Sequence, residues 1–224
     1  MRIAGLASLA FVLCVPALSA QSVDPRLTEA IGWYTGMAGR MDDARARALL
    51  LEAAADEDPV SQMWVARCYS RGRMQFERDE AKASAIAGGV RGEIARLAEA
   101  NVAEAAFLMG TLYDEGLSVD ADPAVAAAWF HRAADLGHLL AEHNLGNAYA
   151  AGRGVPQSDA MAVYWWRRPA AAGDAVPQFR LAQMYEEGRG VERDPPQALD
   201  WYRRAAERGH AGAREALRRL ESKR

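Results

Sequence analysis

The sequence predicts an all-α solenoid in which about five helix-turn-helix repeats are followed by a C-terminal capping helix. Three observations support this prediction. A pattern of apolar, aromatic and glycine residues returns with a period of 36 residues in three consecutive copies. In each copy, one helix ends at a glycine and the next begins at an oxygen-bearing residue that can cap it. The apolar residues also recur with helical periodicity.

The glycine-rich stretch "NLGNAYAAGRGV", residues 144–155, shows how the first helix of a copy ends. A phosphate-binding loop follows a strand and opens a helix, because the helix N-terminus supplies the amides that hold the anion. Here the glycines follow a helix, and a helix C-terminus repels anions. The stretch is therefore predicted to be a structural turn with a glycine cap. Its pattern returns in the next copy: Leu145, Tyr149 and Gly152 correspond to Leu181, Tyr185 and Gly188.

The second helix of a copy has its own start signal. The three signals are Asp122-Pro123, Ser158-Asp159 and Asp194-Pro195. An oxygen-bearing side chain caps free amides at such a site, and proline suits the first turn. Trp129, Trp165 and Trp201 share one position of this helix, on a face of small residues. A large ring among small residues fills the space between close helices, so we expect these tryptophans in the core rather than in a cofactor site.

Weaker copies of the pattern lie upstream. The first 36-residue copy is preceded by a longer unit with about eight extra residues, where Gly88 and Gly89 are expected to break a long helix. Pro169 is expected to kink its helix by deleting one hydrogen bond. At the far end, Glu221 replaces the tyrosine, which suits a last helix without a neighbour. The expected units are 21–57 (degenerate repeat), 58–101 (divergent repeat with an insertion), 102–137, 138–173, 174–209 and 210–224 (capping helix and tail).

Residues 1–20 have the layout of a cleaved secretory signal. Arg2 precedes an apolar run that ends at Pro16, and small residues follow up to Ala20, where cleavage is expected. No later segment reaches the ~20 apolar residues of a membrane span, so we expect a periplasmic protein without one. The mature chain would keep a single cysteine, Cys68, which is expected to be a buried, inert thiol.

The charged and polar residues give no sign of a catalytic or metal site. The chain has 27 basic and 30 acidic residues, whereas a nucleic-acid-binding protein needs a basic face. None of the four histidines pairs at the spacing of a helical metal clamp. His138, Asp174 and His210 share one repeat position, where capping of a helix is the expected role. No nucleophile motif is present, so we expect no enzyme activity, no cofactor and no metal.

The repeat pattern is "A-x-x-x-L-G-x-x-Y-x-x-G-x-G-V" followed by "A-x-x-W-[FYW]-x-x-A-A-x-x-G". Over residues 105–217 it closely resembles the Sel-one-like repeat, a relative of the tetratricopeptide repeat, and the match is partial over residues 25–104. The resemblance implies a right-handed α/α superhelix that binds partners on its concave face. A cysteine-rich branch of the family is linked to β-lactam binding or hydrolysis. This chain lacks the cysteine pairs of that branch, so the activity is not carried over.

The expected function is that of a non-enzymatic periplasmic adaptor, regulator or inhibitor, such as an immunity protein. Its expected partner is another protein, periplasmic or secreted, and not a nucleic acid. Two alternatives remain at this stage. One is a cell-wall or β-lactam hydrolase on the same scaffold, and the other is a structural envelope scaffold for polysaccharide export.

The expected binding surface lies on the first helix of each repeat, opposite its packed side. Four residues share this position and are called the ladder: Met63, Phe107, His143 and Phe179. Four more flank them: Arg67, Thr111, Asn147 and Gln183. Large apolar side chains beside polar groups are typical of a recognition surface. The alternative is that the ladder wedges between adjacent first helices, because a solenoid helix touches neighbours on both flanks.

Overall fold

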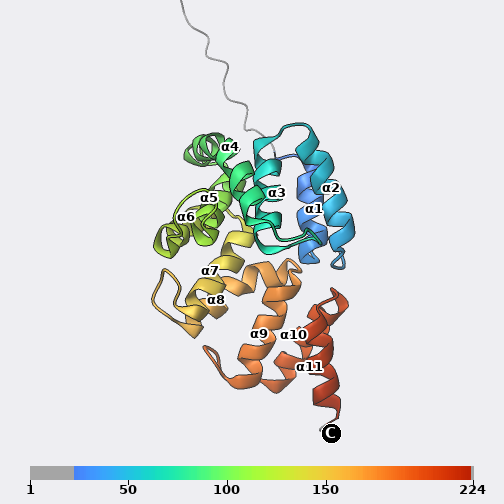
Figure 1. Ribbon diagram of the computed structural model, residues 1–224. Helices are drawn as coiled ribbons and strands as arrows, with labels where there is room; N and C mark the ends of the chain where they lie inside the picture. The colour runs from blue at the N-terminus through green and yellow to red at the C-terminus, as the bar shows by residue number, and fades with distance from the viewer. Residues whose placement is uncertain (1–22, 223–224) are drawn as a thin grey trace, which may run out of the picture.

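A computed structural model describes residues 23–222, in which it contains eleven helices and no strand (Figure 1). The helices are α1 (Pro25–Thr35), α2 (Asp43–Ala55), α3 (Pro59–Arg71), α4 (Glu80–Glu99), α5 (Ala103–Glu115), α6 (Pro123–Asp135), α7 (Leu139–Ala151), α8 (Asp159–Ala171), α9 (Ala175–Glu187), α10 (Pro195–Glu207) and α11 (Ala211–Glu221). Ten of them form successive antiparallel pairs, and α11 follows the last pair. The predicted signal segment, residues 1–20, lies outside the described residues.

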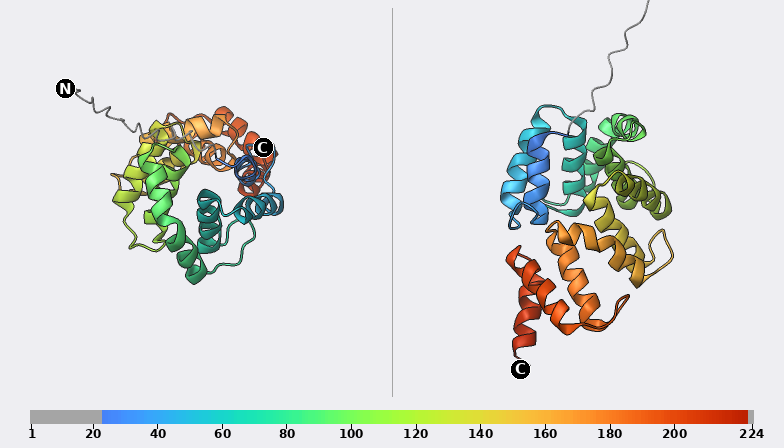
Figure 2. Two further views of the ribbon diagram at one scale, coloured as in Figure 1. Left: turned by 90° about the horizontal axis from the view of Figure 1, so that it is seen from above. Right: turned by 180° about the vertical axis from the view of Figure 1, so that it is seen from behind.

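The pairs wind about a common axis and form a superhelix (Figure 2). After one turn, the chain returns to its own beginning. The amide of Met41 donates to the carbonyl oxygen of Arg208 at 2.8 Å, and Nη1 of Arg208 donates to the carbonyl oxygen of Gly36 at 3.2 Å. The turn between α1 and α2 therefore contacts the turn between α10 and α11, and the first and last pairs support each other.

The glycine-rich turns are structural, as the order of helix and glycine predicts. The first helix of every pair ends at a glycine in the left-handed conformation: Gly36, Gly72, Gly116, Gly152 and Gly188. The second glycine of the turn has a packing role. A Cβ on Gly154 would lie 2.0 Å from the carbonyl oxygen of Pro123, and one on Gly190 would lie 2.4 Å from that of Asp159. Each turn thus rests against the start of the second helix in the preceding pair.

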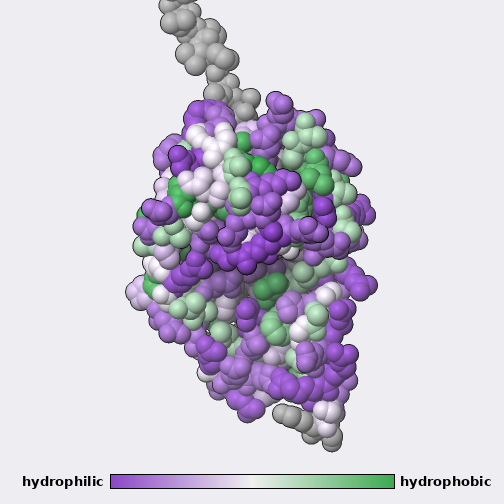
Figure 3. Space-filling model, viewed as in Figure 1, coloured by the Kyte–Doolittle hydropathy of each residue, from purple (hydrophilic) through white to green (hydrophobic). Residues whose placement is uncertain are grey.

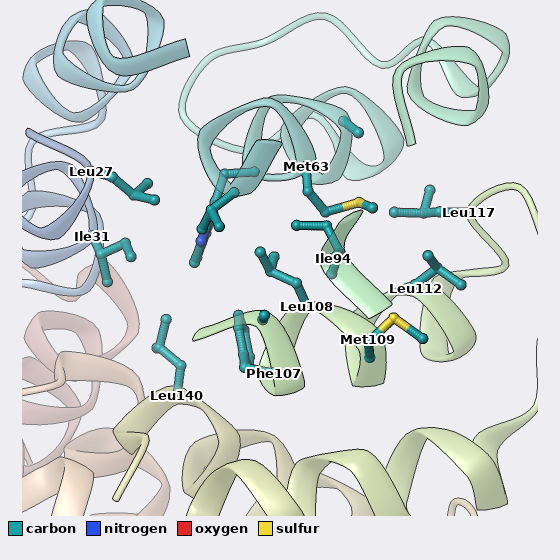
Figure 4. Packing of buried hydrophobic residues seen from close by; sticks show 14 of the residues in the cluster. Leu27, Ile31, Met63, Ile94, Phe107, Leu108, Met109, Leu112, Leu117 and Leu140 are labelled. Carbon is teal, nitrogen blue, oxygen red and sulfur yellow. The ribbon is translucent and has the colours of Figure 1, made fainter. Parts of the chain in front are cut away.

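The buried side chains form one large cluster and two small ones. The large cluster takes residues from α1 to α7, with Leu27 and Leu145 at its two ends in the sequence. In Figure 4, Leu27 and Ile31 of α1 point toward the same space as Phe107 of α5 and Leu140 of α7. The two small clusters lie between α8 and α9 and among α9, α10 and α11.

The expected core position of the second helix was wrong by one residue. Trp129, Trp165 and Trp201 are half-buried at the edges of the clusters. The residues that follow them fill the core instead: Phe130, Trp166 and Tyr202. The small residue that makes room for each ring lies on the first helix. A Cβ on Gly110 would lie 2.5 Å from the Phe130 ring, and one on Gly146 would lie 2.3 Å from the Trp166 ring.

Gly88 and Gly89 do not break α4, which is one helix of 20 residues, so that prediction was wrong. Each glycine costs a helix about 1 kcal/mol relative to alanine. The apolar face of α4 is buried at Ala83, Ala87, Ile94, Leu97 and Ala98, and this burial outweighs the cost. Helix α8 likewise continues past the buried Pro169 to Ala171 and has 13 residues, as α6 does.

Candidate partner-binding groove

Each ladder residue from α5 onward contacts the N-cap of the next first helix. The ring of Phe107 stacks on the ring of His138, with centroids 4.5 Å apart, and Phe179 stacks on His210 at 4.4 Å. Between these two pairs, Nδ1 of His143 lies 2.8 Å from Oδ2 of Asp174, the N-cap of α9. The ladder therefore wedges between neighbouring first helices, which is the alternative left open by the sequence.

Two ladder residues do not lie on an open surface. Met63 is 1% exposed and Phe107 is 0% exposed, so their assignment to a partner-binding surface is corrected. Both belong to the large cluster, to which α1 and α7 also contribute, and the ring of Phe107 lies against Trp64 of α3 and His138 at the start of α7. His143 and Phe179 remain half-buried, with part of each side chain accessible.

The residues that flank the ladder border two adjoining cavities. Arg67 and Asn147 line a cavity of about 290 Å³ among α3, α5, α6 and α7. Asn147 and Gln183 line a second cavity of about 420 Å³ that extends to α9. Because Asn147 borders both cavities, we treat them as one feature, called the groove. Thr111 is buried, and its hydroxyl donates to the carbonyl oxygen of Phe107, so it does not contribute.

Glu115 is the centre of a buried charge cluster in the first cavity. Its Oε1 accepts from Nη2 of Arg73 at 2.7 Å, and its Oε2 accepts from the hydroxyl of Ser70. Burial on its own would raise the pKa of Glu115, but Arg67, Arg73 and these hydrogen bonds lower it below its usual value. Glu115 is therefore a carboxylate held in place by two neighbours.

The guanidinium of Arg67 lies beside this cluster and donates no hydrogen bond to a described residue. The residue is only 6% exposed, and its guanidinium packs over the rings of Trp64 at 4.5 Å and Phe107 at 5.0 Å. Its Nε is 3.8 Å from Oε1 of Glu115, which is beyond hydrogen-bond distance. Within residues 23–222, neither Nε nor Nη1 has a hydrogen-bond partner. Burial, followed by the charge of Arg73, lowers the pKa of Arg67.

The other arginines of the groove are paired. Nη2 of Arg153 lies 3.2 Å from Oδ1 of Asp114, and Nη1 of Arg189 lies 3.3 Å from Oε2 of Glu187. Arg180 donates to Oε1 of Gln183 at 3.2 Å. The view in Figure 3 shows a largely hydrophilic face, with apolar residues in a hollow between the N-terminal and C-terminal helices.

A second buried network joins α3, α5 and α7. Oε1 of Glu104 accepts from Nε1 of Trp64 at 2.6 Å, and its Oε2 lies 2.8 Å from Nε2 of His138. Nδ1 of His138 accepts from the amide of Ala141, so the neutral ring carries its proton on Nε2 and donates it to Glu104. Burial on its own would raise the pKa of Glu104, but His138 and Trp64 lower it below its usual value.

The histidine and cysteine side chains have structural roles. His138 and His210 cap α7 and α11, and Asp174 caps α9, as their shared repeat position predicts. The thiol of Cys68 is buried, and burial raises its pKa to about 12, so it is neutral and inert. In the described part of the chain, no three His, Cys, Asp or Glu side chains are grouped as metal ligands.

The sequence reasoning missed Glu104, Glu115 and Arg73. Glu104 had a usable signal, because it is a charged residue at a repeat position that Leu140 and Val176 occupy in the next copies. Glu115 is the last residue of α5, and Arg73 lies in the turn after α3, so the two come from different repeats. No periodic signal in the sequence links them.

Comparisons with known proteins place the repeats. The model of the Sel1 repeat matches residues 59–83, 103–138, 139–174 and 178–210, which together make up more than half of the chain. A Sel1 repeat protein from Oxalobacter formigenes is similar in structure, with a TM-score of 0.55, 34% identity, and coverage of 80% of this chain and 50% of that chain. A protective antigen of uropathogenic Escherichia coli strains that displays an SLR fold has a TM-score of 0.54 and 28% identity, with coverage of 84% of this chain and 38% of that chain.

This chain therefore spans half or less of the length of these two relatives. No curated protein matches it. Between residues 23 and 222, no helix has the length and apolar character that a membrane crossing requires.

Proposed function

The chain belongs to the Sel1 repeat family, and we propose that it is a non-enzymatic binding protein that acts on another protein in the periplasm as an adaptor, regulator or inhibitor. The observation that supports this most directly is the groove. It consists of two adjoining cavities between successive repeats, and the extended surfaces of solenoids serve as binding sites in this way.

The groove also has the composition of a recognition site. Asn144 and Asn147 line it, and neither side-chain amide makes a hydrogen bond to a described residue, so both can donate and accept toward a partner. Trp166 and Met184 add apolar area to the second cavity. Polar groups beside apolar contacts are what an interface needs for specificity and affinity.

A non-catalytic role is favoured by what the reactive side chains already do. His138 and His210 cap helices, and His143 pairs with Asp174. Cys68 is a buried neutral thiol. A general base or nucleophile needs an accessible atom near a substrate, and these contacts engage the groups that would serve.

The test is to block the groove in the full chain. Asn147→Arg places a long cation between the two cavities, while Tyr164→Arg makes the same addition on α8, where Tyr164 is 59% exposed outside the groove. A partner is first captured from a periplasmic extract with the wild type and identified by mass spectrometry. Its Kd is then measured with the three proteins by calorimetry.

We expect Asn147→Arg to weaken binding at least about 10-fold with little change in Tm, and Tyr164→Arg to leave binding unchanged. Equal binding by the wild type and Asn147→Arg would show that the groove is not the binding surface. Localisation is tested separately by the intact mass of the protein from the periplasmic fraction, which should show the loss of about twenty residues.

A further inference from the structure

We propose that the first cavity of the groove binds a carboxylate of the partner protein, and that Arg67 is the anchor for it. This inference rests on the proposed function and adds the chemistry of the group that the partner presents. The cavity lies between α3 and α7, where Arg67, Asn144 and Asn147 face a space of about 290 Å³.

The first argument is the state of Arg67. A buried charge is costly unless it is paired and hydrogen-bonded. Arg67 is nearly fully buried, yet its Nε and Nη1 have no hydrogen-bond partner among residues 23–222, and the nearest oxygen of its ion-pair partner Glu115 is 3.8 Å away. Glu115 does not supply this acceptor, because Arg73 and Ser70 hold its carboxylate where its Oε1 stays 3.8 Å from Nε of Arg67, beyond hydrogen-bond distance. A carboxylate from outside would complete the contacts of Arg67.

The second argument is the charge of the cavity. Its lining contains three arginines, Arg67, Arg73 and Arg153, and two acids, Asp114 and Glu115. One positive charge is therefore left over, and it matches the single negative charge of a carboxylate. A phosphate group carries about −1.5 to −2 at neutral pH and would face both acids, so it fits less well.

The third argument is that Arg67 is held in position before any partner arrives. Its guanidinium packs over Trp64 and Phe107, which are both buried. A fixed guanidinium binds a carboxylate with two parallel hydrogen bonds and loses little side-chain freedom in doing so. The amides of Asn144 and Asn147 can donate to the same group from α7.

The test is a selection of peptides with free C-termini from a random library on the wild-type full chain. Selected peptides are synthesised again with each Asp or Glu changed to Asn or Gln, and separately with an amidated C-terminus. We expect one of these changes to weaken binding about 10- to 100-fold, because hydrogen bonds to charged groups contribute that much. Loss on the side-chain change identifies an acidic residue, and loss on amidation identifies a chain end.

Two protein variants assign the effect to Arg67. For the Arg67→Met variant, removal of the peptide's carboxylate should change the Kd of the peptide little. Arg180→Met is the matched control, because it removes the same charge from the second cavity. Removal of the peptide's carboxylate should weaken binding to this variant about as much as it weakens binding to the wild type. If Arg67→Met does not fold, Arg67→Lys keeps the charge, loses the two-bond geometry and should show an intermediate loss.

The proposal is wrong if selected peptides bind the wild type equally well with and without their carboxylates, or if Arg67→Met retains the full difference between them. Either result leaves the proposed function standing, because the peptides still bind. If instead every peptide selected on the wild type binds the Asn147→Arg variant equally well, the groove itself is not a binding surface. That outcome contradicts the proposed function as well.

Discussion

The N-terminal region, α1–α7, shares one large hydrophobic cluster, whereas α8–α11 are held by two small ones. The N-terminal region also contains both buried charge networks, around Glu104 and around Glu115. Apart from the contact between the turn after α10 and the turn after α1, the C-terminal region is closer to a regular solenoid, in which each pair contacts only its neighbours. One repeat pattern therefore supports two kinds of packing.

The largest difference between the regions is expected for their tryptophans. Trp64 is fully buried and donates to Glu104, whereas Trp201 is half-buried between two small clusters. Trp64→Ala should lower the free energy of unfolding by about 3–5 kcal/mol, because it leaves a cavity and removes a partner of a buried carboxylate. Trp201→Ala should cost about 1 kcal/mol, because less area is lost. Urea denaturation followed by circular dichroism measures both, and equal losses would contradict the regional difference.

The next largest difference is expected for two capping histidines at the same repeat position. His138 and His210 both cap a first helix and both stack on a phenylalanine, but only His138 contacts a buried carboxylate, that of Glu104. His210→Ala should cost about 1 kcal/mol for the lost cap. His138→Ala should cost about 3 kcal/mol, because it also leaves Glu104 buried with one partner fewer.

The control for this pair is Glu104→Gln combined with His138→Ala. Removing the charge should recover part of the loss in the His138 variant, since the buried carboxylate causes it. No recovery would mean that capping alone explains the effect of His138. Chemical denaturation of the wild type, Glu104→Gln, His138→Ala and the double variant gives the coupling energy between the two residues directly.

The sequence predicted the order of the helices and their ends, because those depend on neighbouring residues. Gly152 ends α7 and Asp122 caps α6 for local reasons that any window of the sequence contains. The core position of the second helix was missed by one residue, since Trp129 and Phe130 are both large and aromatic and only the position of Gly110 on the facing helix selects Phe130.

The candidate site was predicted only in part. Helical periodicity placed Asn147 and Gln183 on the open side of their helices, and both line the groove. The same periodicity put Met63 and Phe107 there as well, although both are buried. Their burial depends on contacts between repeats, such as those of Phe107 with Trp64 of α3 and with His138 before α7, and these join residues far apart in the chain, which periodicity cannot reveal.

A smaller effect is expected from exchanging equivalent residues of two turns. Gly154 in the turn after α7 corresponds to Ser118 in the turn after α5, and both have positive φ, 73° and 57°. Gly154→Ser should cost roughly 2–3 kcal/mol, because its Cβ would meet the carbonyl of Pro123 and the conformation is strained.

Ser118→Gly should change the free energy of unfolding by less than about 1 kcal/mol, because relief of the strained φ offsets the extra freedom of glycine in the unfolded chain. Thermal and urea unfolding of both variants measure the two effects. Equal changes in the free energy of unfolding for the two variants would mean that the close contact of Gly154 with Pro123 is not the reason for glycine at this position.

The smallest effect is a difference in the response of the two regions to pH. Burial, together with the charge of Arg180, lowers the pKa of His210 below 6.5, although Asp174 opposes this. The unfolded chain then binds more protons than the folded chain below pH 6.5, so this contribution to stability is present above that pH and decreases as the pH falls. The pKa of Glu104 is also lowered, from 4.5, so its contribution is retained until the pH falls below that value.

Between about pH 7.5 and pH 5.5, the C-terminal region should therefore lose stability while the Glu104 network keeps its own. His210→Asn keeps a capping side chain and removes the titrating ring, so the variant should lose less Tm over this range than the wild type. His131→Asn, at a half-buried site on α6, is the control and should behave as the wild type does. Hydrogen exchange should show faster opening of α11 than of α5 at the lower pH. The opposite outcome is that the wild type and His210→Asn lose Tm equally and that hydrogen exchange opens α1–α7 first. The pH response would then belong to the N-terminal region, and the two regions would differ in packing alone.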